Sequence, residues 1–271
     1  MNAISTLGRA TVRNVCGFGD FCVFTGQMLA SMVRGVGRWR NWKLAVPQMY
    51  EAGTRSIPVV VITGAFVGMV LAVQTVTQFR AIGLEAGMGA IVNKSVLMEL
   101  GPVIAALALA GRVGGGLTAE LGTMRVTEQI DALRAMGSNP IRVLVVPRVI
   151  ACVLLIPILT VYSDLTGILG GYAVSTYVYN VEPAEFWRLA RTTVGYWEIF
   201  YGLSKSFFFG GAIGIICCYK GFRCAPGAAG VGRACTGAFV ASCMAILALN
   251  LFIGMFLNAI YESIWGTTPW L

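Results

Sequence analysis

Histidine is absent from the 271-residue chain. This absence excludes histidine-based catalytic triads, the usual zinc sites and histidine proton relays. Charged residues make up only 12% of the chain, against about 25% in a typical soluble domain. The chain is 57% hydrophobic, and its apolar residues form blocks long enough to cross a bilayer. We therefore expect one integral membrane domain.

Motifs for enzymatic chemistry are also missing. The chain contains no G-x-x-x-x-G-K-[ST] sequence, so it does not bind ATP through a P-loop. It has no nucleophile elbow and no metal cluster, and its eight cysteines form no C-x-x-C pair. We predict no catalytic residue, no metal ligand and no cofactor in this chain, so a separate subunit must supply any energy.

The apolar blocks predict an all-α membrane protein with five transmembrane helices. The expected spans are approximately Ile57–Gln78, Val96–Thr118, Val143–Gly171, Tyr196–Tyr219 and Ala234–Asn258. Each has the roughly 20 residues that a bilayer core requires. We assign residues 56–260 to this five-helix domain, 1–55 to an N-terminal membrane-associated segment and 261–271 to a short extracytoplasmic tail.

Basic residues predict the orientation. They gather in residues 34–55, 119–148 and 220–233, which should therefore lie in the cytoplasm. Five spans then place the N-terminus inside and the C-terminus in the periplasm. The formal charge of +8 fits membrane orientation and anionic headgroups better than nucleic-acid binding.

The N-terminal stretch Val15–Val33 is apolar, but Asp20 interrupts it. It is open to three interpretations: a signal peptide, a sixth span, or an interfacial or partly inserted helix. A sixth span would disturb the alternation of basic connections, and no convincing cleavage site is present. These observations favour the interfacial helix.

A short polar helix is expected within residues 127–137. Thr127 is the predicted N-cap, Glu128 belongs to its first turn and Gly137 follows its end. An apolar stripe of Val126, Ile130, Leu133 and Met136 faces away from the polar residues Glu128, Asp131 and Arg134. Such a helix lies on a surface or fills a groove in a partner.

Polar residues within the spans are costly and mark candidate sites. On span one, Val67, Leu71, Gln74 and Gln78 share a face that turns from apolar to polar. This face is either a wall for a ligand with tails and a headgroup or an ordinary interfacial end. Glu99 is either an anchor at a cavity mouth or an acid favoured by a helix dipole.

Other features of the spans allow two interpretations each. Arg112 either pairs with Glu120 or extends to the membrane surface, and Lys205 and Asp164 are candidates for a buried pair. Small residues four apart mark either a dimer seam or packing within the chain. These pairs are Gly64/Gly68, Gly111/Gly115, Gly167/Gly171 and Gly210/Gly214.

Five sequence motifs carry a resemblance to a known family. They are GMVLAVQ (68–74), ELGPV (99–103), AGRVGGGLTAELGTM (110–124), TEQIDAL (127–133) and NPIRVLVVPR (139–148). In this order they resemble the MlaE/YrbE family, the permease subunits of ABC transporters for phospholipids or other lipids. The resemblance covers roughly residues 45–258.

The resemblance implies a homodimer in the inner membrane with a lipid pocket at the dimer interface. It implies P-loop ATPase subunits that bind ATP and Mg²⁺, an MCE-domain lipid carrier and, in some systems, a STAS-domain protein. The implied phospholipid-binding residues are Leu71, Gln74, Gln78, Phe79, Met98 and Glu99. The implied ATPase-coupling residues are Glu128, Gln129, Ile130, Asp131, Leu133 and Met136. Many relatives have a basic residue where this chain has Met98.

Two functions from other classes compete with a permease. A membrane-embedded lipid-modifying enzyme would use Glu99, Asp164 and Lys205 as acid and base, but the chain lacks histidine and any clustered acidic motif. An ion-coupled secondary transporter would need no ATPase, and the chain shows no internal repeat of the kind that many such transporters carry.

Overall fold

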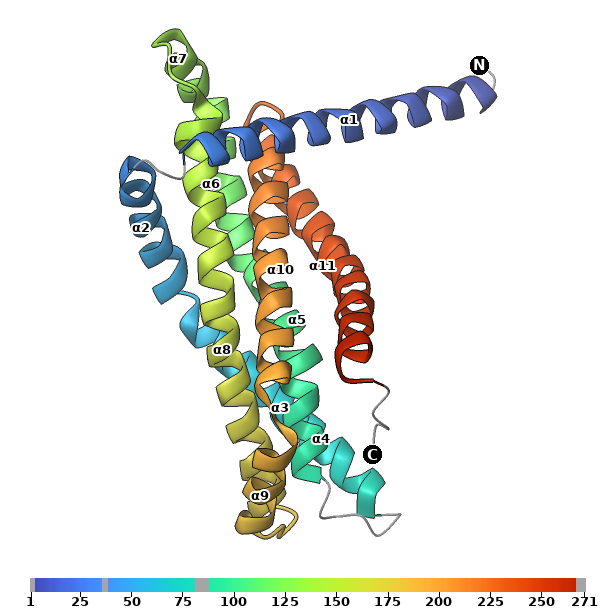
Figure 1. The fold of residues 1–271 in the computed structure, drawn as a ribbon. Helices are drawn as coiled ribbons and strands as arrows, with labels where there is room; N and C mark the ends of the chain where they lie inside the picture. The colour runs from blue at the N-terminus through green and yellow to red at the C-terminus, as the bar shows by residue number, and fades with distance from the viewer. Residues whose placement is uncertain (1–2, 36–38, 81–87, 267–271) are drawn as a thin grey trace.

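The computed structural model describes residues 3–35, 39–80 and 88–266, and all regular elements in these ranges are helices (Figure 1). The α-helices are α1 (Ala3–Gly35), α2 (Trp39–Thr54), α3 (Ile57–Arg80), α4 (Met88–Ser95), α5 (Gly101–Leu109), α6 (Gly115–Val126), α7 (Gln129–Ala135), α8 (Val146–Tyr177), α9 (Pro183–Thr193), α10 (Tyr196–Phe222) and α11 (Ala228–Trp265). Three π-helical turns are η2 (Val96–Leu100), η3 (Ala110–Gly114) and η4 (Ile141–Val145). The all-α prediction is confirmed.

Five segments are long and apolar enough to span a membrane, as predicted. They are Ile57–Phe79, Gly89–Val126, Ile141–Tyr177, Tyr196–Phe222 and Ala228–Ile264. The second has 38 residues, about 57 Å of helix, whereas the bilayer core is about 30 Å thick. All five segments are longer than the predicted spans. The last helix continues to Trp265, past the predicted boundary at residue 260.

The N-terminal helix α1 lies across one end of the bundle (Figure 1). Its buried residues Phe24 and Met28 join a core cluster with Phe222, while Val15 and Phe18 are exposed. This crosswise arrangement agrees with an interfacial helix. Its depth in a bilayer stays a prediction.

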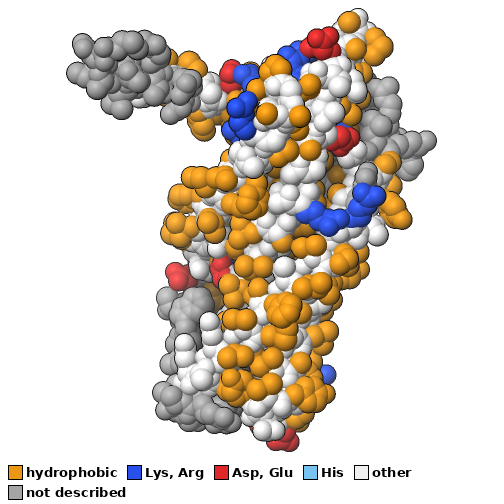
Figure 2. Space-filling model, turned by 180° about the vertical axis from the view of Figure 1, so that it is seen from behind, with side chains coloured by type: hydrophobic (Ala, Val, Ile, Leu, Met, Phe, Trp, Pro, Cys, Tyr) orange, Lys and Arg blue, Asp and Glu red, His pale blue; other side chains and the backbone are white. Residues whose placement is uncertain are grey.

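The two ends of the bundle differ in charge. α7, α1 and the α10–α11 connection lie at one end, which we call the α7 end, and α9 lies at the other (Figure 1). The 119–148 and 220–233 basic connections therefore lie at a single end of the bundle, where α1 also lies. Figure 2 shows most charged side chains near that end and a largely apolar surface below it.

Helix α8 is the centre of the bundle, and α3 and α10 approach it through glycines. A methyl group on Gly68 would overlap the carbonyl oxygen of Gly167, and one on Gly210 would lie 2.7 Å from the carbonyl oxygen of Cys152. Close backbone approach stabilises helix pairs in lipid. The glycine pairs Gly64/Gly68 on α3, Gly167/Gly171 on α8 and Gly210/Gly214 on α10 therefore pack helices within the chain. Gly115 differs, because a methyl group there would meet nothing within 4 Å.

We predict that Gly68→Ala separates α3 from α8 and destabilises the permease by about 1–3 kcal/mol, the usual cost of overpacking. The measurement is thermal unfolding of the purified protein in detergent. Gly116→Ala is the matched control, because a methyl group there meets no atom within 4 Å. Equal unfolding temperatures for the two variants would contradict the tight α3–α8 contact.

Candidate functional site: a polar cluster between three spans

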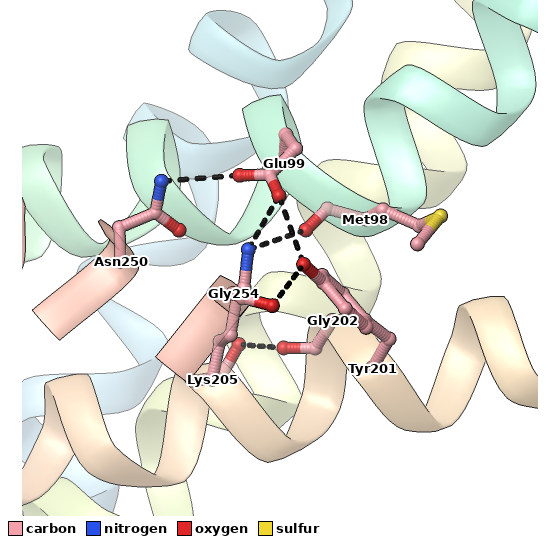
Figure 3. Close-up of polar contacts among 8 residues, drawn as sticks. Met98, Glu99, Tyr201, Gly202, Lys205, Asn250 and Gly254 are labelled. Atoms are coloured by element: carbon pink, nitrogen blue, oxygen red, sulfur yellow. Dashed lines mark hydrogen bonds and ion pairs between the residues drawn. The ribbon is translucent and has the colours of Figure 1, made fainter. Parts of the chain in front are cut away.

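Glu99 is the centre of a polar cluster that joins spans two, four and five (Figure 3). Lys205 Nζ lies 2.6 Å from Glu99 Oε1, and Asn250 Nδ2 donates to Glu99 Oε2 at 3.0 Å. The Tyr201 hydroxyl lies within reach of two acceptors, Glu99 Oε1 at 3.3 Å and the Gly254 carbonyl at 3.4 Å. One carboxylate therefore contacts α10 and α11 at once.

The two charged members of this cluster differ in exposure. The Lys205 side chain is fully buried, at 0%, whereas that of Glu99 is 45% exposed. The Lys205 ammonium also donates to the Met98 carbonyl at 3.4 Å and lies 4.3 Å from the centre of the Tyr201 ring. A buried ammonium is tolerated only when it is paired and hydrogen-bonded. Glu99 presents the accessible face of this ion pair.

The π-helical turn η2 positions this cluster. Glu99 belongs to η2, where the Gly101 N–H donates to the Val96 carbonyl, five residues back. Such turns interrupt α-helical register and often occur at functional sites. Gly202 on α10 then packs directly against the Leu97 carbonyl, where a side chain would overlap it. This close approach allows Lys205, one turn further along α10, to reach Glu99.

The predicted Lys205–Asp164 pair is wrong. The neighbouring residue Ser206 faces α8, where its hydroxyl donates to Thr160 Oγ1 at 3.1 Å. The side chain of Lys205, the residue before Ser206, points to a different side of α10 and faces η2. Asp164 is buried on α8. Its carboxylate lies so close to Gly101 that a methyl group added to this glycine would overlap it.

Arg112 does not form the predicted pair with Glu120. Glu120 is instead paired with Arg148, whose side chain is 4% exposed. Arg112 is exposed and lines a cavity near the α2–α3 junction.

The six predicted lipid-binding residues lie in two groups. Met98 is buried with Tyr201 and Leu257, next to the half-exposed Glu99. On α3, Gln74 and Gln78 are exposed, while Leu71 and Phe79 are partly buried. Whether the two groups line one pocket stays a prediction. The sequence reasoning missed Tyr201 and Asn250. A signal for the first was its spacing of four residues from Lys205, and a signal for the second was an isolated amide in an apolar span.

The predicted coupling helix exists as α7, but its start differs from the prediction. Thr127 ends α6, and its hydroxyl donates to the Thr123 carbonyl at 2.9 Å. The N-cap is Glu128, which has a left-handed φ of 58° and no side-chain cap. Because α6 continues to Val126, the backbone must change direction over Thr127 and Glu128. Gly137 follows the helix as predicted, with φ of 74°.

The residues of the predicted apolar stripe on α7 differ in burial. Ile130 is fully buried in the cluster that contains Phe24 and Met28. Leu133 is partly buried, and Met136 is 72% exposed. Asp131 accepts from Arg125 at 2.6 Å and Arg134 at 3.0 Å, so it helps to hold α7 on α6. The stripe's exposed members are Val126, at 37%, and Met136, so its two ends rather than its centre are available to a partner.

This fold, with five spans and a buried ion pair between them, defines an α-helical multi-pass membrane protein. Residues 45–256 match the family model described as Permease MlaE. The chain therefore belongs to the MlaE permease family.

Relatives cover nearly the whole chain. A probable ABC transporter permease protein of Rickettsia bellii is 38% identical over 93% of this chain and 96% of its own length. The intermembrane phospholipid transport system permease protein MlaE of Haemophilus influenzae is 32% identical over the same shares. Protein TRIGALACTOSYLDIACYLGLYCEROL 1 of Arabidopsis thaliana is 35% identical over 86% of this chain and 66% of its own length.

We predict that Glu99→Leu destabilises the permease by about 3 kcal/mol, because it leaves the Lys205 ammonium buried without its partner. Lys205→Met should cost less, since Glu99 is half exposed to its surroundings and retains Asn250. The double variant should recover much of the loss. Thermal unfolding of all three variants tests this order, and a larger loss from Lys205→Met than from Glu99→Leu would contradict it.

Proposed function

We propose that this chain is the transmembrane permease subunit of an ATP-driven ABC transporter that moves phospholipid and maintains lipid organisation in the cell envelope. The observation that carries the proposal is membership of the MlaE permease family across residues 45–256. The matching protein of Haemophilus influenzae, of which the match covers 96%, is named as an intermembrane phospholipid transport system permease protein. Five apolar spans agree with a lipid path through the membrane.

The proposed cargo site is the predicted pocket around Leu71 and Glu99. A lipid tail gains about 0.8 kcal/mol per buried CH₂ relative to water but almost nothing relative to bilayer lipid. The pocket must therefore select cargo by its shape and by headgroup contacts. Glu99, held by Lys205 and Asn250, is a fixed polar group for this purpose. Because the Lys205 ammonium balances its charge, the half-exposed carboxylate offers a headgroup hydrogen-bond acceptors rather than a net charge.

The proposed assembly is a homodimer in the inner membrane. P-loop ATPase subunits bind ATP and Mg²⁺ at the α7 end, an MCE-domain protein carries lipid on the periplasmic side, and a STAS-domain protein joins in some systems. ATP-driven rearrangement opens and closes the lipid cavity between the two permeases. The basic residues at the α7 end support its cytoplasmic location.

We predict that cysteine tags at Gly137 and Gly227 react from the cytoplasm and that a tag at Val181 reacts from the periplasm. The physical reason is the collection of basic connections at the α7 end. The measurement is labelling of intact cells with a membrane-impermeant maleimide, followed by labelling after lysis. Labelling of the Gly137 tag in intact cells would overturn the orientation and the ATPase site together.

We predict that Met136→Asp weakens ATPase binding about tenfold, because it places a charge on an exposed apolar contact. Leu133→Asp should act in the same direction. Ile130→Asp is unsuitable, since Ile130 belongs to the permease's own core. The measurement is co-purification of the ATPase with the folded permease.

Tyr177→Asp is the matched control for the coupling test, because Tyr177 is 80% exposed and ends α8 at the α9 end of the bundle. It should retain the ATPase fully. Full ATPase stoichiometry with Met136→Asp would place the docking site elsewhere.

We predict that Leu71→Arg blocks lipid transfer without unfolding the dimer, since it places a charge against the lipid tails, whereas Leu71→Met should retain transfer. Photo-crosslinkers at Leu71 and Met98 should capture phospholipid in amounts that change with the ATPase and the carrier. A crosslinker at Phe208, which is 56% exposed on α10, should show no such change. Responses at Leu71 and Met98 that match the one at Phe208 would remove these residues from the pocket.

A further inference from the structure

Asp164 on α8 is a carboxyl group that is buried between the spans without a partner. Its residue is only 5% exposed, and its Oδ1 atom has no hydrogen-bond partner among the described residues. A carboxylate that is removed from water without a partner carries a large desolvation penalty. Such a group is therefore either paired with a cation or neutralised by a proton.

The basic side chains on the helices around this part of α8 are paired with other carboxylates. α3 has an ionisable residue only at its last position, and α5 has none. On α10, Lys205 is paired with Glu99, which the Tyr201 hydroxyl also contacts. Lys94 on α4 lies 3.8 Å from Glu198 on α10, measured from Nζ to Oε1. These described side chains leave a proton as the means to neutralise the buried carboxyl group.

The carboxyl group of Asp164 adjoins the backbone of the π-helical turn η2. A methyl group on Gly101 would overlap Asp164 Oδ1 and would lie 2.8 Å from the Val96 carbonyl oxygen, so both oxygens border one small space. The Val96 carbonyl accepts from the Gly101 N–H, and a carbonyl oxygen has a second lone pair. A proton on Asp164 supplies the donor that these two neighbouring acceptors lack.

We propose that Asp164 binds a proton and that the neutral acid donates a hydrogen bond to the Val96 carbonyl, which fixes η2 and so positions Glu99. Val96 and Glu99 belong to the same five-residue turn. Ionisation of Asp164 would replace this bond with repulsion between two oxygens. Asp164 is therefore a positioning residue for the headgroup contact of Glu99, a role that rests on the proposed transport function. The proton stays on Asp164 and is not a transported ion.

The first test is infrared spectroscopy of the purified permease at neutral pH, in a detergent without carbonyl groups. A neutral carboxylic acid has a C=O band apart from those of carboxylates and amides, and this band shifts in D₂O, unlike that of a lipid ester. The band should be present in the wild type, absent from Asp164→Asn and retained in Glu99→Gln. A wild type without the band, or Asp164→Asn with it, would overturn the proposal.

The second test is the pH dependence of thermal unfolding. The neutral acid holds η2 at low pH, so the wild type should lose stability as the pH rises and Asp164 ionises. Asp164→Asn should not show this loss, because its amide donates to the same carbonyl and does not ionise. Glu99, Tyr201 and Lys205 are present in both proteins, so the difference between the two profiles isolates Asp164.

Ser163→Ala is the matched control for the unfolding profile, because it removes a neighbouring buried hydroxyl that also has no partner among the described residues. Its unfolding temperature should fall with rising pH as that of the wild type does. Identical profiles for the wild type and Asp164→Asn would refute a bound proton on Asp164.

The third test measures the positioning of the site. A photo-crosslinker at Met98, which precedes Glu99 in η2 (Figure 3), is used in vesicles of phosphatidylethanolamine and phosphatidylglycerol. Asp164→Ala removes the donor and should lower phospholipid labelling about tenfold, the effect of losing one buried hydrogen bond. Asp164→Asn should retain the labelling. Full labelling with Asp164→Ala would overturn the positioning role.

Failure of this proposal is distinct from failure of the proposed transport function. A Met98 crosslinker that captures no phospholipid in any variant would count against the proposed cargo site. The infrared and unfolding measurements use neither added lipid, ATPase nor carrier, so they decide the protonation of Asp164 in either case.

Discussion

The buried ammonium of Lys205 is the constraint on which the polar centre of this bundle depends. A charge at 0% exposure must be paired, and the pairing with Glu99 connects spans two and four. Asn250 extends the same contact to span five. The π-helical turn η2 and the close approach of Gly202 bring the partners together, so backbone irregularity and charge burial are parts of one arrangement. The accessible side of Glu99 is what this arrangement presents to a ligand.

The glycine contacts of α8 provide the rigid frame around that centre. They hold α3 and α10 against α8 by backbone approach, which requires no apolar driving force between helices in lipid. The core cluster that contains Val60, Ile156 and Phe209 lies along the same helices. The frame separates the Glu99 cluster from the α7 end, where Ile130 fastens α7 to the chain's own core. A contact made with α7 therefore acts on a helix that is already packed against α6 and α1.

The five spans could be predicted because each carries about 20 apolar residues, and Gly137 marked the end of α7 because few other residues adopt its positive φ. The partner of Lys205 could not be predicted, since it depends on the rotation of α10, and Ser206 rather than Lys205 faces α8. The start of α7 was misplaced because α6 continues to Val126 and leaves Thr127 as its last turn. The burial of Ile130 depends on α1, more than 100 residues earlier in the chain, which a local stripe does not reveal.

The most direct test of the account is lipid transfer by a reconstituted assembly of the permease with its ATPase and lipid carrier. The measured quantity is the movement of labelled phospholipid between permease vesicles and carrier, followed by chemical analysis of the lipid. The account predicts transfer that requires ATP, persists without an ion gradient and leaves the lipid chemically unchanged. Transfer that continues without ATP and stops when the ion gradient collapses would contradict it, as would conversion of the lipid by the permease alone.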